Sequence, residues 1–366
     1  MKLSMVIVVV AVVVIIIVAG LYALGVFSSP APTCTTTWQC SAGYPLGVGG
    51  AYAVAGQQCV NSTSNFICMG GLDANGGPRS EVYYSSPVSS TSPNITSWTP
   101  NSNPYPQYVD GQSCVVSSGY VYCVGGSYNS EGDDIASSYF APLSPTGILG
   151  NWSSTTSYPI PIDTQSCVTM SSYIYCVGGE NETDGSYTDV ALTNSVWYAS
   201  LSTSGIGKWI HSTAYPPGVY YPSCYAANSY IYCLGGADIN SNSLTNVYYA
   251  TLSSSGVGPW ASTTSYPVAA SSPACVVSSG YMYCVGGETA PGSSSSAPSF
   301  TNAVYYATLT ASGIGNWKSA PSFPYSTWTA CLTSAGNVYC FGGFDNLSQA
   351  GEDNIVHYAS LASLSG

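Results

Sequence analysis

The sequence predicts an all-β protein assembled from six copies of one unit. A thirteen-residue motif, CVVSSGYVYCVGG at residues 114–126, recurs six times at intervals of 51 to 57 residues, and its two cysteines are always nine positions apart. A fixed period near fifty residues with a double glycine is typical of a β-propeller, whose blades are four-stranded units. We therefore expect six blades over residues 38–366. The copies begin at Cys59, Cys114, Cys167, Cys224, Cys275 and Cys331.

The amino terminus precedes the repeats and differs from them in composition. Residues 5–27 form an apolar run without a charged side chain. As a helix this run would span about 34 Å, enough to cross the hydrocarbon core of a bilayer. A secretory signal has a shorter apolar region, so we expect one transmembrane helix within residues 1–27, with a cleaved signal peptide as the alternative. Residues 28–37 would then be a linker.

Two features indicate that the rest of the chain is extracellular. Fourteen cysteines, an even number with a repeated spacing, are typical of a disulfide framework in an oxidising compartment. Five Asn-x-Ser/Thr sequons predict glycosylation. We therefore expect a single-pass protein of the cell membrane with its propeller outside. The sequons begin at Asn61, Asn94, Asn151, Asn181 and Asn346.

The chain is unusually poor in charge. Only 5% of its residues are Asp, Glu, Lys or Arg, against roughly 25% in ordinary soluble proteins. Four basic residues at a net charge of −12 exclude electrostatic binding of nucleic acid.

The cysteine motif predicts a hairpin closed by a disulfide. Its midpoint falls between Ser118 and Gly119, so a two-residue turn would place Cys114 opposite Cys123. In a non-hydrogen-bonded pair the two Cα atoms lie about 4.5 Å apart, within disulfide range. Zinc is the competing interpretation, and the hairpin spacing and the absence of nearby His argue against it. The expected pairs are Cys59–Cys68, Cys114–Cys123, Cys167–Cys176, Cys224–Cys233, Cys275–Cys284 and Cys331–Cys340.

Cys34 and Cys40 remain, and by elimination we expect them to pair. Six residues in extended conformation would hold their Cα atoms too far apart for a disulfide. The pairing therefore requires a bend in the chain, or else an intermolecular link.

Two further strands follow each hairpin. In the fourth repeat, for example, Val-Tyr-Tyr at residues 247–249 precedes the Gly-x-Gly turn at 256–258 and Trp260. A double glycine, then a tyrosine, then a tryptophan resembles the kelch repeat, and this resemblance over residues 38–366 implies a propeller. The paired cysteines and the sparse charge around the glycines depart from the kelch pattern, so the resemblance implies the fold and not a function.

The sixth repeat lacks the tryptophan strand because the sequence stops where the other repeats turn. Trp38 precedes Tyr44 and Pro45 as Trp152 precedes Tyr158 and Pro159. We therefore expect the Trp38 strand to close the last blade, which leaves no exposed sheet edge.

All sixteen carboxylates lie either after a double glycine or just before a hairpin. Because antiparallel strands alternate in direction, these loops share one face of the ring, and we expect that face to point away from the membrane. A solvated rim is the plainest interpretation. Calcium is the alternative. Its candidate ligands are Glu180, Glu182 and Asp184, which alternate along the Glu-Asn-Glu-Thr-Asp-Gly segment at 180–185, with Asp189 nearby; the downstream glutamate of an EF-hand is lacking.

The loops before the hairpins should form the mouth of the central channel. Aromatic rings beside carboxylates suit a polar ligand such as a sugar. The residues expected at the mouth are Tyr108, Asp110, Asp163, Tyr220, Tyr221 and Trp328.

Catalytic motifs are scarce. With His211 and His357 as the sole histidines, a copper site like that of kelch-type oxidases lacks ligands. Asp110 and Asp163 occupy matched positions on adjacent blades, about 10 Å apart or less, which overlaps the roughly 6.5–9.5 Å carboxylate spacing of inverting glycosidases. No enzyme activity is expected, with a carbohydrate-active enzyme as an alternative.

We therefore expect a membrane-anchored envelope or adhesion and recognition component with a glycan or protein ligand on its acidic face. A self-assembling subunit of a surface layer or filament is the structural alternative. No cofactor is expected, apart from the calcium alternative.

Overall fold

The computed structural model describes residues 34–45, 56–73, 77–128, 133–181, 191–290, 298–345 and 352–365, with backbone alone at 343–345 and 352–354. One compact unit spans Cys34–Gly366. Four residues of the expected linker, 34–37, therefore belong to the folded unit. The expected anchor, residues 1–27, lies outside the described residues, and in the described part of the chain no helix has the length and hydropathy needed to cross a membrane.

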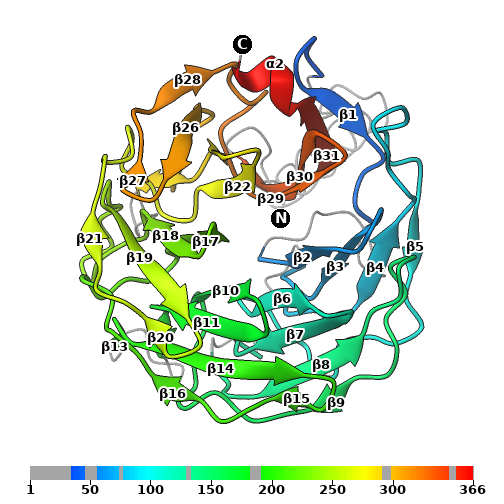
Figure 1. The fold of residues 1–366 in the computed structure, drawn as a ribbon. Helices are drawn as coiled ribbons and strands as arrows, with labels where there is room; N and C mark the ends of the chain where they lie inside the picture. Colours follow the sequence, from blue (N-terminus) through cyan, green and yellow to red (C-terminus); the bar gives the residue numbers. More distant parts are fainter. Residues whose placement is uncertain are drawn as a thin grey trace, which may run out of the picture. The chain divides into compact units, whose positions relative to one another are not determined.

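Six four-stranded antiparallel blades are arranged in a ring (Figure 1). From the axis outward, blade 1 consists of β2 (Gln58–Asn61), β3 (Phe66–Met69), β4 (Val82–Ser85) and β5 (Trp98–Pro100), and blade 2 of β6 (Ser113–Ser117), β7 (Tyr120–Val124), β8 (Ser138–Pro142) and β9 (Ser153–Ser154). Blade 3 consists of β10 (Ser166–Met170), β11 (Tyr173–Val177), β14 (Val196–Ser202) and β16 (Ile210–His211), and blade 4 of β17 (Ser223–Ala227), β18 (Tyr230–Leu234), β19 (Val247–Ser253) and β21 (Ala261–Ser262). Blade 5 consists of β22 (Ala274–Ser278), β23 (Tyr281–Val285), β26 (Val304–Thr310) and β28 (Lys318–Ala320).

Blade 6 is built from both ends of the described chain. It contains β29 (Thr327–Ser334), β30 (Asn337–Asp345), β31 (Glu352–Ser360) and, as its outer strand, β1 (Gln39–Ser41). β1 runs antiparallel to β31, with Gln39 opposite Tyr358 and Ser41 opposite Val356. The short helix α2 (Leu361–Ser365) follows β31 and buries Leu361 and Leu364.

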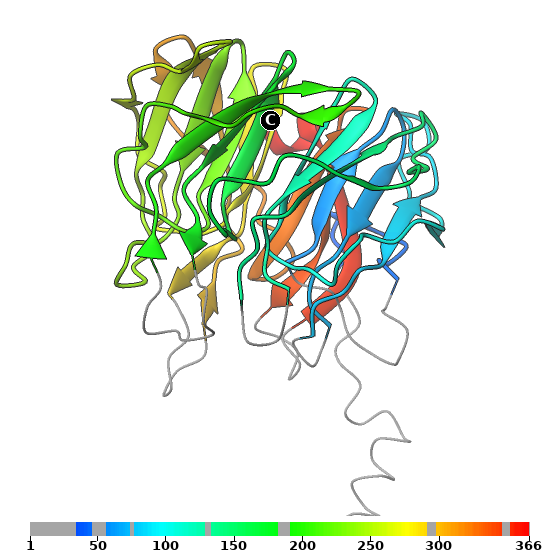
Figure 2. The ribbon, with the colours of Figure 1, turned by 90° about the horizontal axis from the view of Figure 1, so that it is seen from below.

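Short strand pairs supplement the blades. Two-residue strands β15 (Gly205–Ile206), β20 (Gly256–Val257) and β27 (Gly313–Ile314) pair with the ends of β14, β19 and β26. The loops after two of the double glycines form the pairs β12 (Glu180–Asn181) with β13 (Ala191–Leu192), and β24 (Glu288–Ala290) with β25 (Ser299–Phe300). In the side view of Figure 2, β24 and β25 lie at one end of the blades and α2 at the other.

The predicted disulfides are confirmed. In all six hairpins the two cysteines are direct cross-strand partners, with Cα atoms 4.0–4.1 Å apart. The chain bends before β1, which brings the Cα atoms of Cys34 and Cys40 to 5.5 Å and allows their intramolecular disulfide. The twelve hairpin cysteines therefore pair in the register that the spacing predicts.

The blades are joined by a repeated aromatic contact. The tryptophan of each blade packs edge-to-face on the aromatic ring that follows the outer strand of the preceding blade, at centroid distances of 4.9–5.1 Å. Such contacts add to the apolar area that the rings bury. The six pairs are Tyr44–Trp98, Tyr105–Trp152, Tyr158–Trp209, Tyr215–Trp260, Tyr266–Trp317 and Phe323–Trp38.

The double glycines allow neighbouring blades to approach closely. Gly125 has a φ of +64°, and a Cβ atom there would lie 2.3 Å from the carbonyl oxygen of Ile162. Any other residue would clash with this backbone and would be strained in the left-handed region. The glycines are thus required for packing between blades.

Candidate ligand site at the mouth of the central channel

A ring of six residues surrounds the axis at one end of the channel. Each lies three residues before the first cysteine of its hairpin, and we call this ring the collar. Five of its members have φ between +48° and +69°, a conformation that is uncommon for the three that are not glycine. The collar consists of Gly56, Gly111, Thr164, Tyr221, Ser272 and Trp328.

Backbone hydrogen bonds link four successive members of the collar. The amide of Thr164 donates to the carbonyl oxygen of Gly111 at 3.1 Å, that of Tyr221 to Thr164 at 3.2 Å, and that of Ser272 to Tyr221 at 3.0 Å. Each bond joins two blades, so the collar positions its side chains through backbone contacts between blades 2 and 5.

The acidic loops lie at the same end of the blades as the collar. Asp110 and Asp163 precede the collar residues of their blades, and they form β-bridges with Ser127 and Glu180, which follow the double glycines. The two loop classes therefore share one face, as the strand directions predict.

The collar opens into a cavity of about 250 Å³ that continues between the innermost strands. All six collar residues line it, together with hydroxyl and amide groups deeper in the channel, including Ser113, Gln165 and Tyr225. Five cysteines of the hairpin disulfides also contribute to its wall: Cys59, Cys114, Cys167, Cys224 and Cys331. Its volume is close to the lower end of the roughly 300–1,000 Å³ of typical ligand pockets, which restricts it to a small ligand.

Two aromatic rings meet in the cavity wall. Tyr221 of blade 4 and Trp328 of blade 6 pack edge-to-face with centroids 5.1 Å apart. The Nε1 atom of Trp328 donates to the hydroxyl of Ser272 at 2.8 Å. The small Ser272 side chain of blade 5 lets the two rings meet across it, and Tyr220 packs on Tyr221 at 5.5 Å.

The two predicted carboxylates lie just behind this wall. A Cβ atom at Gly111 would be 3.2 Å from Oδ2 of Asp163, and one at Gly56 would be 3.8 Å from Oδ2 of Asp110. Each carboxylate therefore covers the glycine of the preceding blade. Neither Asp110 nor Asp163 lines the cavity itself. The collar residue next in sequence, Gly111 or Thr164, lines it instead.

The environment of both carboxylates favours the protonated form. Burial raises the pKa of Asp110 to about 7. Burial also raises the pKa of Asp163 well above its usual range, and the negative charges of Asp134, Glu180 and Asp110 add to this shift. The mouth of the channel thus holds one carboxyl group, that of Asp110, which exchanges a proton near neutral pH, and a second, that of Asp163, whose pKa is raised.

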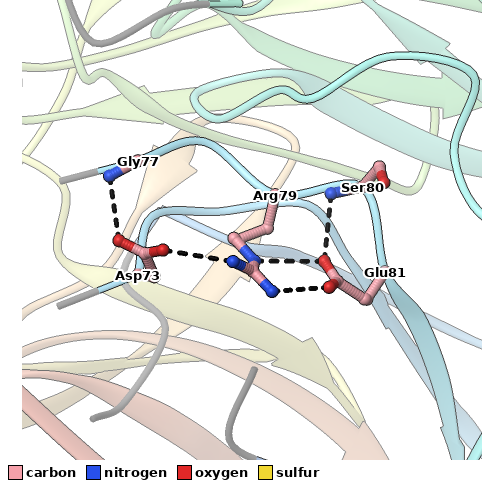
Figure 3. Close-up of polar contacts among 5 residues, drawn as sticks. All are labelled: Asp73, Gly77, Arg79, Ser80 and Glu81. Atoms are coloured by element: carbon pink, nitrogen blue, oxygen red, sulfur yellow. Dashed lines mark hydrogen bonds and ion pairs between the residues drawn. The ribbon is translucent and has the colours of Figure 1, made fainter. Parts of the chain in front are cut away.

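One basic side chain of the described residues lies on this face, and it is bound by carboxylates (Figure 3). The guanidinium of Arg79 donates to Asp73 at 3.2 Å and to both oxygens of Glu81 at 2.6 and 3.2 Å. Its charge is thereby neutralised locally.

Other predicted site residues lie elsewhere. Tyr108 is 62% exposed and does not line the cavity. Of the calcium candidates, Glu180 lies in β12, while Glu182, Asp184 and Asp189 fall outside the described residues. Within the described part of the chain, no three His, Cys, Asp or Glu side chains are grouped to hold a metal ion.

The sequons differ in their surroundings. Asn94 and Asn151 are exposed, whereas the Nδ2 atom of Asn61 donates to the carbonyl of Thr333 at 2.7 Å and that of Asn181 to Pro161. Asn346 lies outside the described residues.

Sequence reasoning missed Gln165, Tyr225 and the disulfide sulfurs in the cavity wall. A signal exists for the first and the last, because the hairpin strand nearest the axis presents alternate side chains to the channel. Positions one and three residues after the collar give Gln165 and the first cysteine of each hairpin, whereas Tyr225, four residues after Tyr221, breaks this alternation.

Comparison with known proteins identifies the architecture and nothing finer. No protein-family model matches the chain, and no curated protein matches it. A solved structure described as "Structure of YjhT" is similar, with a TM-score of 0.67, 13% sequence identity, and coverage of 86% of this chain and 95% of that chain. The chain is a six-bladed β-propeller. At this level of identity the similarity shows the fold alone, and function must be argued from the channel mouth.

Proposed function

We propose that this propeller is a recognition component of the cell envelope that binds a small polar ligand, such as a carbohydrate, at the collar. The observation that carries the proposal is the pair of rings from Tyr221 and Trp328 in the wall of a small cavity. Large side chains of a propeller usually pack between its blades. Two large aromatic rings in the wall of a cavity can instead contact a bound ligand. The C–H face of a sugar suits an aromatic surface.

Polar groups beside the rings would orient such a ligand. The Ser272 hydroxyl accepts from Trp328 and keeps its own proton for donation. Thr164 and Gln165 also line the cavity. A few convergent polar groups beside apolar surface are the usual composition of a specific small-molecule site.

The location of the protein is part of the same proposal. The apolar run at 5–27 would anchor it in the cell membrane, and seven disulfides suit an extracellular environment. Glycans would be attached first at Asn94 and Asn151, which are exposed. The kelch-like interpretation of the repeats also belongs here, because the propeller fold supports it without distinguishing it from other propeller families.

A glycan array probed with the full-length chain in nanodiscs tests the binding function. We expect a restricted set of bound glycans, and Trp328→Ala and Tyr221→Ala should each weaken their binding at least about tenfold. Tyr108→Ala is the matched control, because this exposed aromatic on the same face lies outside the cavity. Binding that survives both cavity substitutions, or an array without any bound glycan, would contradict the proposal.

Electron cryotomography of native envelopes with the protein labelled tests its placement. A recognition protein should be scattered over the outer surface of the membrane. Regular arrays or filaments would instead support a structural subunit.

A carbohydrate-active enzyme is the second candidate: the raised pKa of Asp110 favours it, whereas the position of Asp110 outside the cavity lining counts against it. A carboxyl group protonated near pH 7 is suited to act as a general acid at a glycosidic oxygen. Incubation of bound glycans with the wild-type protein and with Asp110→Asn tests this activity. Hydrolysis that Asp110→Asn abolishes would support it, and intact glycans after prolonged incubation with the wild type would eliminate it.

A further inference from the structure

We propose that the chemical group recognised at the collar is a positively charged primary ammonium. This inference rests on the proposed function only in placing the ligand in the collar cavity. It concerns the part of the ligand that gives specificity, and it follows from the absence of basic groups, from unpaired acceptors and from the arrangement of carboxylates.

No basic side chain is available to an anionic ligand. None of the residues that line the cavity is Lys, Arg or His. Arg79, on the same face, already binds Asp73 and Glu81. A carboxylate or phosphate entering the cavity would therefore find no cation, and the negative charges of Asp134 and Glu180 on this face would disfavour it.

Buried acceptors beside the cavity lack donors. The Nε2 atom of Gln165 donates to the carbonyl oxygen of Val124 at 2.8 Å. The Oε1 atom of the same side chain is buried without a hydrogen-bond partner, and the residue is only 5% exposed. Oδ1 of Asp163 is likewise buried without a hydrogen-bond partner. Unpaired buried oxygens leave negative potential that no solvent screens, and a nearby positive charge would compensate it.

Four carboxyl groups act electrostatically on Tyr221, one of the two aromatic residues in the wall. Tyr221 lies in the electrostatic field of Asp163, Glu180, Asp110 and Glu288. Burial raises the pKa of Asp163, and two of these carboxylates, Glu180 and Asp110, add to the shift together with Asp134. Their mutual repulsion is relieved either by a proton or by a cation placed among them.

The rings themselves favour a cation. An ammonium within about 6 Å of a Trp or Tyr ring centroid is attracted to the negative face of the ring. Tyr221 and Trp328 provide two such rings at the cavity, and hydroxyl groups nearby can accept the N–H donors of the ligand. An ammonium is attracted both by the faces of the rings and by the negative potential beside the cavity, whereas a neutral hydroxyl is attracted by neither to the same extent.

Isothermal titration of the full-length protein with three probes at pH 7 tests the inference. The probes are 2-aminoethyl glucoside, 2-hydroxyethyl glucoside and ethanolamine. We expect the aminoethyl glucoside to bind at least about tenfold more tightly than its hydroxyethyl counterpart. Equal affinity of the two glucosides would overturn the inference and leave the proposed carbohydrate binding intact.

The ethanolamine arm distinguishes the sources of the ammonium. Binding of ethanolamine as tight as that of the aminoethyl glucoside would support an ammonium site that makes no use of the sugar, and would count against the carbohydrate part of the proposed function. Weaker binding of ethanolamine would support an amino-bearing sugar. If neither amine binds, the ammonium inference fails, whatever the glycan array shows.

Matched variants locate the interaction. Asp163→Asn and Asp110→Asn should each reduce the preference for the amine at least about tenfold. Asp133→Asn makes the same substitution on the same face, at a carboxylate that is not among those acting most strongly on Tyr221, and should leave the preference unchanged. Thermal unfolding of each variant checks that the fold is retained, and equal effects of all three substitutions would overturn the proposed site.

Proton release is a further readout that a purely structural role would not produce. The neighbouring Asp134, Glu180 and buried Tyr221 disfavour the ionised forms of Asp110 and Asp163, and a cation bound nearby would stabilise these forms. Binding at pH 7 should therefore release protons to the buffer. Titrations in buffers of different ionisation enthalpy measure this release. Its persistence in an Asp110→Asn, Asp163→Asn double variant would contradict the assignment.

Discussion

The indole Nε1 of Trp38 donates a hydrogen bond of 3.2 Å to the carbonyl oxygen of Pro321, 283 residues away in the sequence. Trp38 is fully buried, and its ring packs on Phe323 with centroids 4.9 Å apart. Between blades 2 and 3, Trp209 makes the same two contacts, to the carbonyl of Thr156 and to Tyr158. The closure of the propeller therefore repeats the contact that joins the other blades.

Truncation of Trp38 should open the ring. Trp38→Ala removes a fully buried aromatic ring, and we expect a loss of about 3–5 kcal/mol in the free energy of unfolding. Trp38→Phe retains an aromatic contact with Phe323 and loses only the hydrogen bond, so about 1 kcal/mol is expected. Urea unfolding followed by circular dichroism measures both values, and a wild-type midpoint for Trp38→Ala would refute the closing role of β1.

A hairpin disulfide should contribute a moderate stabilisation. Replacing Cys167 and Cys176 by Ala opens a ten-residue loop, for which chain entropy predicts a loss of about 2.5–3 kcal/mol at most, and less if the hairpin persists. Unfolding of the double variant beside the oxidised wild type gives the difference. A non-reducing peptide map is the control for pairing, and links other than the nine-residue ones would contradict the register.

The double glycines should be sensitive to a single methyl group. At Gly235 a Cβ atom would lie 2.2 Å from the carbonyl oxygen of Ala270, whereas at Gly280 it would meet nothing within 4 Å. Both have positive φ, so Gly280→Ala measures backbone strain alone, expected at about 1–2 kcal/mol. Gly235→Ala adds the clash and should lower the thermal midpoint much further. Equal midpoints would show that blade contact is not the reason for the glycine.

The protonation of Asp110 should make the protein more stable in acid. Its pKa is about 7 in the folded chain against 3.8 as an ordinary value, so between these limits the folded state holds a proton that the unfolded state releases. The stabilisation is complete below about pH 4 and is lost as the pH rises through 7. Asp110→Asn should therefore gain a few kcal/mol relative to wild type between pH 4 and pH 8. A pH-independent difference would contradict the buried carboxyl.

His357 should act in the opposite direction. Burial lowers its pKa to about 4 from 6.5, and its ring is fully buried between Phe323 and Tyr325. The neutral form stabilises the fold above pH 6.5, and this contribution, on the order of 3 kcal/mol, is lost as the pH falls through 4. His357→Gln should remove that loss, which urea unfolding at pH 7 and pH 4 can show. If His357→Gln loses as much stability between pH 7 and pH 4 as the wild type does, other groups cause the loss.

Much of the fold follows from local spacing. The nine-residue separation of Cys114 and Cys123 determines their register because a two-residue turn leaves no other pairing, and the same count predicts six of the seven disulfides. The position of Trp38 relative to Tyr44 predicts the composite last blade for the same reason. These features depend on residues close in sequence or on repetition, which a sequence displays directly.

The candidate site is less predictable. Tyr221 and Trp328 were expected at the mouth, but their contact across Ser272 depends on the angle between blades 4 and 6. Asp110 and Asp163 were expected to line the mouth, and the collar residue after each one instead forms the wall. That offset arises because each carboxylate covers the glycine of the preceding blade, a relation that spans two repeats.

The sequence alone determined the number of blades, the hairpin register, the disulfide pairs and the face on which the carboxylates gather, because each follows from a periodic count along strands of alternating direction. The tertiary structure alone decided that six collar residues enclose a cavity and that two aromatic rings meet in it. It also decided that burial raises the pKa of Asp110 to about 7 and raises that of Asp163 well above its usual range. These properties depend on distances and desolvation between blades, which no repeat contains by itself.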